Sequence, residues 1–268
     1  MKITIVMPTC NSEQYIKQSI DSIINQEYQN WELLIYDNCS KDNTVDIIGN
    51  YLNFDHRIKL CVEKDAGVAE ALNKGFKKST GDILCWLNSD DLYVSKFVLR
   101  DIIKNFKECS PYFIVSNFFN IDNKNKIIKT FYSFLPRKKI KNIFYYNQIF
   151  TGAFFFKKNC FEKFKNFNIN YKYAFEYEFI IFLLKNYIGL YVDNFYAAFR
   201  ILPNSLSSNK NLLENEKKKI FSSYDLIYSN SIYLRIYSYF LLGILLKVII
   251  NYIFDKNKNK NIIDYYTK

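Results

Sequence analysis

Short apolar runs alternate with segments of helical periodicity over the first hundred residues, and this alternation restricts the fold more than any other feature. The pattern predicts strands over residues 2–7, 31–36, 58–62 and 82–87. Helices are expected to open near residues 11–13 and to span about 44–52 and 68–78. This order is typical of parallel strands joined by right-handed crossovers, so we expect an α/β fold with a mostly parallel, Rossmann-like sheet and flanking helices.

The second half of the chain is less regular. It predicts strands over 112–119 and 127–131, an apolar run over 149–156, a helix over 174–186, one or two strands within 191–201, and a helix from Leu212. The polar stretch 203–210 is the best candidate for the boundary between the main domain and the tail. We therefore expect one α/β domain over residues 1–210 and a helical, apolar and basic tail over residues 211–268.

An acidic loop, Asn88-Ser89-Asp90-Asp91, directly follows the predicted strand 82–87. Its carboxylates therefore lie at the carboxyl end of a parallel strand, where open α/β sheets bind their ligands. Adjacent carboxylates are costly to desolvate unless a cation or hydrogen-bond donors face them, and their oxygens suit Mg²⁺ or Mn²⁺, which commonly bridge phosphates. The alternative is a solvated turn that caps the next helix through Asp91 or Ser95.

Carboxylates also follow the neighbouring strands. Asp37 ends the second predicted strand and Asp65 follows the third, so both belong to the same edge of the sheet as Asp90. A lone Asp at a strand end is usually a cap, but several at successive strand ends favour a shared site. Asp37 is suited to accept a hydrogen bond from an imide N–H such as that of uracil, with the backbone of Pro8 and Thr9 completing the contact.

Several classes of function lose support. The first strand is not followed by Gly-x-Gly-x-x-Gly, and no phosphate-binding P-loop motif is present. His56 is the one histidine in the sequence. The chain therefore lacks the residues for a histidine-rich zinc site, and for a Ser-His-Asp triad at any place other than His56. The net charge of +11 suggests an anionic partner, but no nucleic-acid-binding module accompanies it, so we expect no nucleic acid.

The six cysteines are scattered, with no two at metal-ligand or Cys-x-x-Cys spacing, which fits a reducing compartment. The first eight residues are too short and too polar for a signal peptide. Residues 231–254 are strongly apolar but are interrupted by Arg235 and Lys247. We expect a cytoplasmic protein held peripherally on the cytoplasmic face of the inner membrane by this segment and nearby lysines; the alternative is packing against the main domain or a second subunit.

Four stretches, taken together, resemble the inverting glycosyltransferases of family 2, which have the GT-A fold. They are IVMPTCN at 5–11 with Tyr15 and Ile16, IYDNCSKDNT at 35–44, DAG at 65–67 with NKG at 73–75, and GDILCWLNSDD at 81–91. The resemblance covers about residues 2–205. It implies transfer of a sugar, with inversion, from a nucleotide-diphosphate donor such as a UDP-sugar. The acceptor implied is a hydroxyl of a growing glycan or lipid-linked saccharide for a bacterial surface polymer such as lipopolysaccharide or capsule.

The resemblance also implies roles for individual residues. Thr9 and Asp37 match contacts to the base, and Asp65 matches a position near the donor ribose and base. Asp90 matches the metal-binding Asp of an Asp-x-Asp motif whose first position is Asn88 here, and Asp91 is expected to support the donor sugar or the metal's second shell. The residues implied to hold the donor are Pro8, Thr9, Asn11, Asp37, Asp65, Asn88 and Asp91.

Two positions depart from the usual family pattern. Many relatives have His at the position of Leu202, so we expect a Mn²⁺ or Mg²⁺ ion bound mainly by Asp90, the donor diphosphate and water. Glu176 falls where the family places its catalytic base, usually an Asp. Glu178 is the competing candidate, and both also suit a helix N-terminus without any catalytic role.

Two other functions are compatible with parts of this sequence pattern. A sugar-phosphate nucleotidyltransferase also combines a metal with α/β architecture, but it would release pyrophosphate. A non-catalytic sugar-nucleotide-binding protein would need no base, and the presence of Asp90, Asp91 and Glu176 argues against it.

Overall fold

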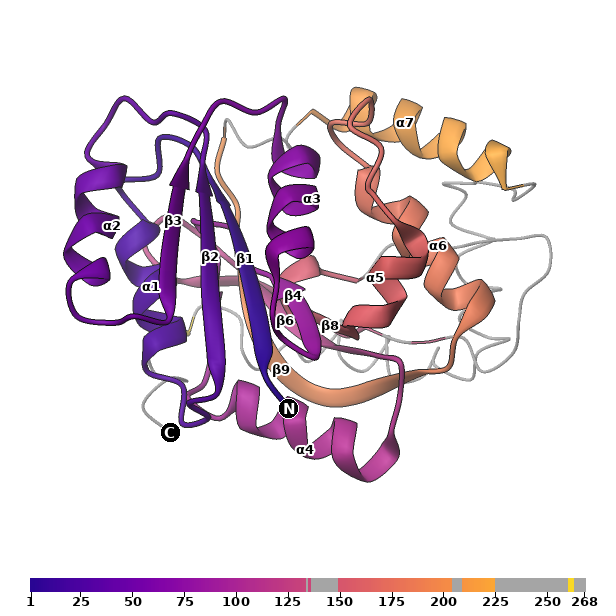
Figure 1. Cartoon of the computed structure of the whole chain (residues 1–268). Helices are drawn as coiled ribbons and strands as arrows, with labels where there is room; N and C mark the ends of the chain where they lie inside the picture. Colours follow the sequence, from indigo (N-terminus) through magenta and orange to yellow (C-terminus); the bar gives the residue numbers. More distant parts are fainter. Residues whose placement is uncertain (134, 136–148, 204–208, 225–259, 263–268) are drawn as a thin grey trace.

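A mixed β-sheet forms the centre of the molecule (Figure 1), with strands in the order β3-β2-β1-β4-β8-β6-β9-β5 and β7 paired to β6. This computed structural model describes residues 1–133, 135, 149–203, 209–224 and 260–262. The strands are β1 (Ile3–Thr9), β2 (Trp31–Asp37), β3 (Ile58–Val62), β4 (Ile83–Trp86), β5 (Leu92–Tyr93), β6 (Phe113–Ile121), β7 (Ile127–Phe131), β8 (Phe154–Lys157) and β9 (Gly189–Arg200).

The first four strands form one parallel part of the sheet, and β6 and β9 form another parallel pair. β1 lies between β2 and β4, and β2 also pairs with β3, all in parallel. Beyond β4 the direction changes, because β8 is antiparallel to both β4 and β6. The expected α/β fold with a mostly parallel core is confirmed, and the carboxyl ends of β1, β2 and β3 lie together at the top of Figure 1.

Helices cover both faces of the sheet. They are α1 (Ile16–Ile24), α2 (Thr44–Leu52), α3 (Val68–Lys78), α4 (Val98–Cys109), α5 (Lys158–Phe164), α6 (Phe175–Asn186) and α7 (Lys210–Ser223), with a short 3₁₀ helix, η1 (Thr151–Ala153). Apolar residues of α1, α2 and α4 pack on one face. Those of α3, α5 and α6 pack on the other.

The bounds of α2, α3, β3 and β7 agree with the sequence prediction. The helix expected to open at residues 11–13 begins at Ile16 instead, because the amides of Tyr15 and Ile16 both donate to the carbonyl of Ser12 in a preceding turn. The prediction placed no element at α4, α5 or β5. The run 149–156 is divided between η1 and β8, and 191–201 forms one strand with register shifts against β6.

The apolar segment 231–254 lies outside the described residues. In the part of the chain that is described, no helix combines the length and the apolar character that a membrane crossing requires.

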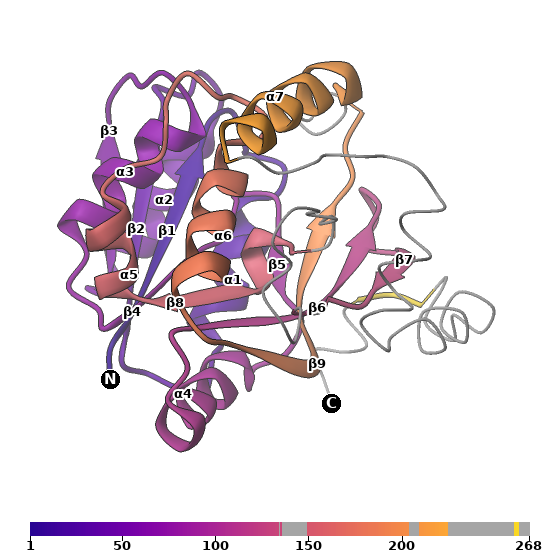
Figure 2. The ribbon, with the colours of Figure 1, turned by 90° about the vertical axis from the view of Figure 1, so that its right-hand side faces the viewer.

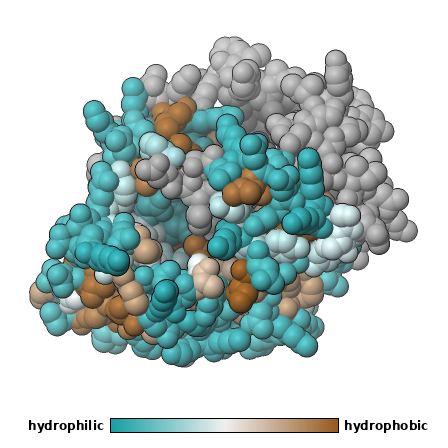
Figure 3. All heavy atoms as spheres, turned by 90° about the horizontal axis from the view of Figure 1, so that it is seen from above, coloured by the Kyte–Doolittle hydropathy of each residue, from teal (hydrophilic) through white to brown (hydrophobic). Residues whose placement is uncertain are grey.

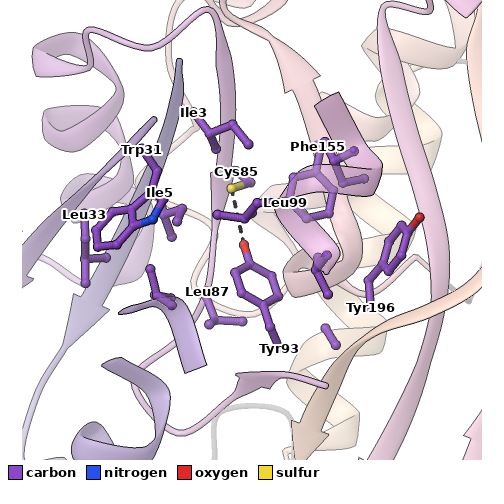
Figure 4. Close-up of a cluster of buried hydrophobic side chains, with 14 of the residues drawn as sticks. Ile3, Ile5, Trp31, Leu33, Cys85, Leu87, Tyr93, Leu99, Phe155 and Tyr196 are labelled. Carbon is purple, nitrogen blue, oxygen red and sulfur yellow. Dashed lines mark hydrogen bonds between the residues drawn. The ribbon is translucent and has the colours of Figure 1, made fainter. Parts of the chain in front are cut away.

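The core on the α1 and α4 side contains mostly aliphatic side chains around one polar contact (Figure 4). Ile3, Leu33 and Leu99 are fully buried there. The sulfur of Cys85 lies 3.5 Å from the hydroxyl of Tyr93, so two buried polar groups satisfy each other. This face therefore anchors β4, the strand that leads into the acidic loop.

The core on the α3, α5 and α6 side is aromatic. Its rings meet mostly edge to face, a favourable arrangement for ring quadrupoles. The ring of Phe167 is 5.7 Å from that of Trp86, 5.2 Å from Phe175 and 5.6 Å from Phe179. Phe167 thus fixes the first turns of α6 against the strand that precedes the acidic loop.

A buried carboxylate joins the strands near the amino end of β1. Glu32 in β2 is only 2% exposed and accepts hydrogen bonds from the hydroxyl of Thr4 (2.7 Å) and the amide of Thr80 (2.7 Å). The ammonium of Lys2 lies 3.0 Å from it. Although burial disfavours the charged form, these hydrogen bonds hold the pKa of Glu32 down to about 2.

We expect Glu32→Gln to lower the free energy of unfolding by roughly 2–3 kcal/mol at pH 7, because the ionised form is favoured in the folded state. A lowered folded-state pKa contributes stability above the unfolded-state pKa and loses it as pH falls toward 2. The gap between variant and wild type should therefore shrink below about pH 4.5, as measured by urea unfolding at pH 7 and pH 3.5. Glu27→Gln, at an exposed ion pair with Arg100, is the matched control. A gap independent of pH would contradict this account.

Candidate nucleotide and carboxylate site

Three loops at the carboxyl edge of the sheet are hydrogen-bonded to one another. The loop after β1 meets the loop after β2 through the amide of Asn11, which donates to Ser40 Oγ (2.7 Å), and Asn11 Oδ1, which accepts from the amide of Lys41 (2.8 Å). The same loop meets the acidic loop after β4, where the hydroxyls of Ser12 and Ser89 are 2.7 Å apart. These contacts bring segments about 80 residues apart into one layer.

The end of β1 contributes Pro8 and Thr9, which lie beside Tyr36 and Asp37 in the parallel register. Thr9 is 5% exposed, and among the described residues its hydroxyl has no hydrogen-bond partner. A buried hydroxyl without a partner is rare in native proteins. The end of β1 therefore carries an unused hydrogen-bonding group among the described residues.

The carboxylate of Asp37 is buried, and it accepts hydrogen bonds from the amide (2.8 Å) and the hydroxyl of Ser40. Asp65 is partly exposed; its Oδ1 accepts from the amide of Gly67 (2.8 Å), and its own amide donates to Asn38 Oδ1 (3.0 Å). Burial raises the pKa of Asp65.

The negative charges of Asp37, after β2, and Asp65, after β3, both act on the thiol of Cys10. Burial, with the neighbouring charges of Asp37 and Asp65, raises the pKa of Cys10. This electrostatic effect requires both carboxylates to lie close to the end of β1. The structure therefore brings the residues predicted to contact the nucleotide into one region.

The two carboxylates of the acidic loop have different surroundings. Asp91 is fully buried; one oxygen accepts from the backbone amide of Arg200 (2.9 Å) and the other from the side-chain amide of Asn88 (2.8 Å). Burial, together with the charge of Asp90, raises the pKa of Asp91 well above its usual range. Asp90 keeps some exposed surface, and no other described residue donates a hydrogen bond to its carboxylate.

Arg200, at the end of β9, holds the acidic loop in place. Its buried guanidinium donates to the carbonyls of Asp90 (2.9 Å) and Asp122 (2.9 Å) and to Gln18 Oε1 (3.1 Å). The guanidinium carbon also lies 4.4 Å from the ring centroid of Tyr15. Sequence reasoning assigned Arg200 no role, although a lone arginine that ends an apolar strand is the signal that points to it.

The described residues contain no group of three or more His, Cys, Asp or Glu side chains placed to hold a metal ion. The side chain of Leu202, at the position where many relatives have His, is apolar and partly buried. The carboxylate of Asp90 is the group in this loop that a cation could use, and Asp91 stabilises the loop through its hydrogen bonds with Asn88 and the backbone amide of Arg200.

Glu176 and Glu178 both lie in the first turn of α6. That end of α6 lies on the same side of the molecule as the carboxyl ends of β1, β2 and β3 (Figure 1), a side on which hydrophilic residues dominate the described surface (Figure 3). Burial raises the pKa of Glu176 to about 7. The pKa of Glu178 is also raised by burial, and its charge acts on the hydroxyls of Tyr171 and Tyr224.

The side chain of Asn73 in α3 joins that helix to the segment that precedes α6, a role that the sequence pattern does not indicate. Asn73 donates to the carbonyl of Phe167 (2.9 Å) and accepts from its amide (2.7 Å). Asn73 is buried, so this pair of bonds replaces backbone pairing for Phe167. The resemblance of residues 73–75 to family 2 thus includes a contact that orients α6.

Comparison with known proteins decides the family. The family model described as glycosyl transferase family 2 matches residues 4–185, which include the three loops and the first turn of α6. The chain belongs to glycosyl transferase family 2. An uncharacterized glycosyltransferase of Haemophilus influenzae is 43% identical over 90 residues, which cover 33% of this chain and 36% of the relative.

A second family 2 relative has a named activity. The UDP-Glc:alpha-D-GlcNAc-diphosphoundecaprenol beta-1,3-glucosyltransferase WfgD of Escherichia coli is 35% identical over 130 residues, 48% of this chain and 50% of that protein. The putative teichuronic acid biosynthesis glycosyltransferase TuaG of Bacillus subtilis is 34% identical over 90 residues, 33% of this chain and 36% of the relative. The matched segments thus span between about a third and a half of these relatives' own lengths.

Solved structures show the fold of this family 2 protein. Residues 1–349 of Staphylococcus aureus TarS, in complex with UDP-GlcNAc, match with a TM-score of 0.68 at 18% identity, over 83% of this chain and 66% of TarS 1–349. The mannosyltransferase PcManGT of Pyrobaculum calidifontis, in complex with GDP-Man and Mn²⁺, matches with a TM-score of 0.63 at 15% identity, over 83% and 63% of the two chains. The expected GT-A fold is confirmed.

We expect Arg200→Met to lower the free energy of unfolding by about 3–5 kcal/mol, because it removes the buried positive charge next to Asp90 and Asp91 and the guanidinium's hydrogen bonds to the carbonyls of Asp90 and Asp122. Arg100→Met is the matched control, since Arg100 is about half exposed and should cost about 1 kcal/mol or less. Chemical denaturation of both variants measures the difference. Equal decreases in the free energy of unfolding for the two variants would show that the buried Arg200 contributes no more to stability than the exposed Arg100.

Proposed function

We propose that this family 2 protein transfers a sugar from a nucleotide-diphosphate donor to a hydroxyl of a growing bacterial surface glycan, with inversion and with Glu176 as general base. The observation that carries the proposal is the position of Glu176 in the first turn of α6, where its pKa of about 7 suits proton transfer near neutral pH. Glu178, the competing base, instead lies beside two tyrosine hydroxyls.

The donor nucleotide is proposed to lie across the ends of β1, β2 and β3. The partnerless hydroxyl of Thr9 and the partly exposed carboxylate of Asp65 support this placement. Asp37 keeps lone pairs beyond those that Ser40 uses, which suits a uracil imide and hence a UDP-sugar. The full set proposed to bind the donor is Pro8, Thr9, Asn11, Asp37, Asp65, Asn88 and Asp91, with Asp91 acting through the loop it stabilises.

Asp90 is the residue proposed to hold a Mn²⁺ or Mg²⁺ ion, and its carboxylate without a protein donor fits that role. Because the described residues offer no three-residue cluster, the remaining ligands would be diphosphate oxygens and water. When bound, such an ion neutralises charge that develops on the leaving nucleoside diphosphate. A divalent ion accompanies the nucleotide sugar in the PcManGT structure, which supports the assignment.

The chain's own part in the reaction is proton removal and orientation. Glu176 accepts the proton of the acceptor hydroxyl as the hydroxyl oxygen bonds to the anomeric carbon and the bond from that carbon to the diphosphate oxygen breaks. General base catalysis of this kind contributes about 10²- to 10⁴-fold. The single displacement inverts the anomeric centre, and it requires neither a covalent nucleophile nor a histidine.

A glycan or lipid-linked saccharide is the proposed acceptor. WfgD is named for an acceptor linked to diphosphoundecaprenol, and TuaG for teichuronic acid biosynthesis, so both names concern cell-surface polymers. The net charge of +11 suits an anionic membrane surface, which supports the proposal that the reaction occurs at the cytoplasmic face of the inner membrane. In this proposal the residues that contact the donor, the metal and the acceptor lie within residues 1–210, and residues 211–268 form the tail, of which α7 packs against α6.

We expect Asp90→Ala and Glu176→Gln each to reduce sugar transfer by at least about 10²-fold while far-UV circular dichroism and thermal unfolding stay close to wild type. The assay follows nucleoside diphosphate released from a panel of UDP-sugars with Mn²⁺ and an acceptor. Glu178→Gln is the matched variant, and it should retain most activity. If Glu178→Gln is inactive and Glu176→Gln active, the base is wrongly assigned. Release of pyrophosphate from a nucleoside triphosphate would indicate a nucleotidyltransferase, and no turnover of any donor a binding protein.

We expect kcat/KM to rise about tenfold per pH unit below about pH 7 and then level off, because the base acts only when it is ionised. A base whose pKa is raised by burial is protonated below that pKa, so activity is lost as pH falls. Initial rates between pH 5.5 and pH 9 measure the profile, with circular dichroism at each pH as a control for unfolding. A flat profile down to pH 5.5 would exclude Glu176 as the titrating base.

A further inference from the structure

The first turn of α6 lacks a cap from its own sequence. Its N-cap residue is Ala174, whose side chain cannot accept a hydrogen bond, whereas most helices use Ser, Thr, Asp or Asn there. The amides at a helix start need acceptors from elsewhere when water is excluded. The acceptor therefore has to come from another part of the chain.

Glu216 of α7 supplies an acceptor for the N-cap residue and the two residues that precede it. Oε1 of Glu216 accepts from the amide of Lys172 (3.0 Å), and Oε2 accepts from the amides of Tyr173 (2.8 Å) and Ala174 (2.9 Å). One carboxylate thus binds three consecutive amides that lie more than 40 residues earlier in the chain. A negative charge at this place also opposes the positive end of the α6 dipole.

Apolar packing keeps Glu216 in register with these amides. Ala174, Tyr177 and Ile181 of the α6 region form a buried cluster with Ile220 and Phe221 of α7. Figures 1 and 2 both show α7 next to the end of α6 where the helix begins. The contact therefore fixes α7 along α6 over more than one turn.

A buried lysine adds a second contact. Lys217 is 4% exposed, and its ammonium lies 4.8 Å from the ring centroid of Tyr177 and 3.5 Å from Glu214. Consecutive residues of α7 therefore place a carboxylate and an ammonium near the start of α6.

These two residues act on Glu176 in opposite directions. Apart from burial, which dominates, the charge of Lys217 lowers the pKa of Glu176 and that of Glu216 raises it. Other titratable groups near the start of α6 are Tyr177 and Glu178 on the same helix, Glu214 on α7, and Tyr171, Lys172 and Tyr173 in the preceding loop. The pKa of Tyr171 is raised by burial, Glu178 and Glu216.

We infer that Glu216 is a positioning residue for Glu176: it fixes the backbone at the start of α6 through the amides of residues 172–174, which makes α7 a working part of the site. This inference rests on the proposed function of Glu176 as base. Glu176 is the second residue of α6, so movement of the turn moves its carboxylate with it. Displacement of a catalytic group by about 1 Å costs on the order of 10²-fold in rate.

The test uses the full chain with Glu216→Ala, Glu216→Gln and Lys217→Met, and with Lys218→Met, an exposed neighbour on α7, as control. Glu216→Ala should lower kcat about 10- to 100-fold and leave donor KM within about twofold, because the donor residues lie on other elements. The acidic limb of the pH profile should move to lower pH in Glu216→Gln and to higher pH in Lys217→Met. Lys218→Met should match wild type.

Opposite shifts distinguish charge from disruption, because two damaged helices would change the profile in the same direction or not at all. Shifts of the same sign, or wild-type kcat in Glu216→Ala, would overturn the inference while Glu176→Gln still tests the base separately. Hydrogen exchange in the unaltered protein gives an independent readout. The amides of residues 172–174 should be protected, and exchange at the rate of exposed loop amides would also overturn the inference.

Discussion

Burial of the Arg200 guanidinium beside Asp91 is the interaction on which the candidate site depends. A buried charge is tolerated only where partners satisfy it, and Arg200 finds them in the acidic loop, in the turn at Asp122 and in Gln18 just before the middle of α1. Movement of the acidic loop would break the hydrogen bond between the guanidinium and the carbonyl of Asp90. The loop after β4 is thereby held at the end of a strand, β9, that lies more than 100 residues later in the chain.

Because of this constraint the adjacent carboxylates of Asp90 and Asp91 have different roles. Asp91 turns inward and uses both of its oxygens to hold the loop, whereas Asp90 keeps exposed surface and a carboxylate to which no other described residue donates. Fixed neighbours mean that little reorganisation is needed when a ligand arrives, which is how preorganised polar sites gain their effect. The proposed metal-binding role of Asp90 thus depends on a neighbour, Asp91, whose carboxylate is used to hold the loop.

A second set of contacts orients α6, the helix that carries the proposed base Glu176. The parallel strands β1 to β4 carry the loops proposed to bind the donor, while α6 is oriented by the aromatic core around Phe167, by Asn73 of α3 and by Glu216 of α7. The two parts meet through β4 and its aromatic neighbour Trp86. The loop proposed to bind the donor and the helix proposed to carry the base are therefore packed against the same strand.

Local pattern was enough to predict α2, α3, β3 and β7, because periodicity and turn-forming residues act within a few positions. The shared edge of Asp37, Asp65 and Asp90 also followed from sequence, since parallel strands end on the same side. The antiparallel β8, the two-residue β5, and the contacts of Arg200 with Asp91 and of Glu216 with the start of α6 did not. Those features join residues 42 to 109 positions apart. Such contacts leave no trace in a local pattern, because the partner that makes burial of a charge favourable is supplied only when the chain has folded.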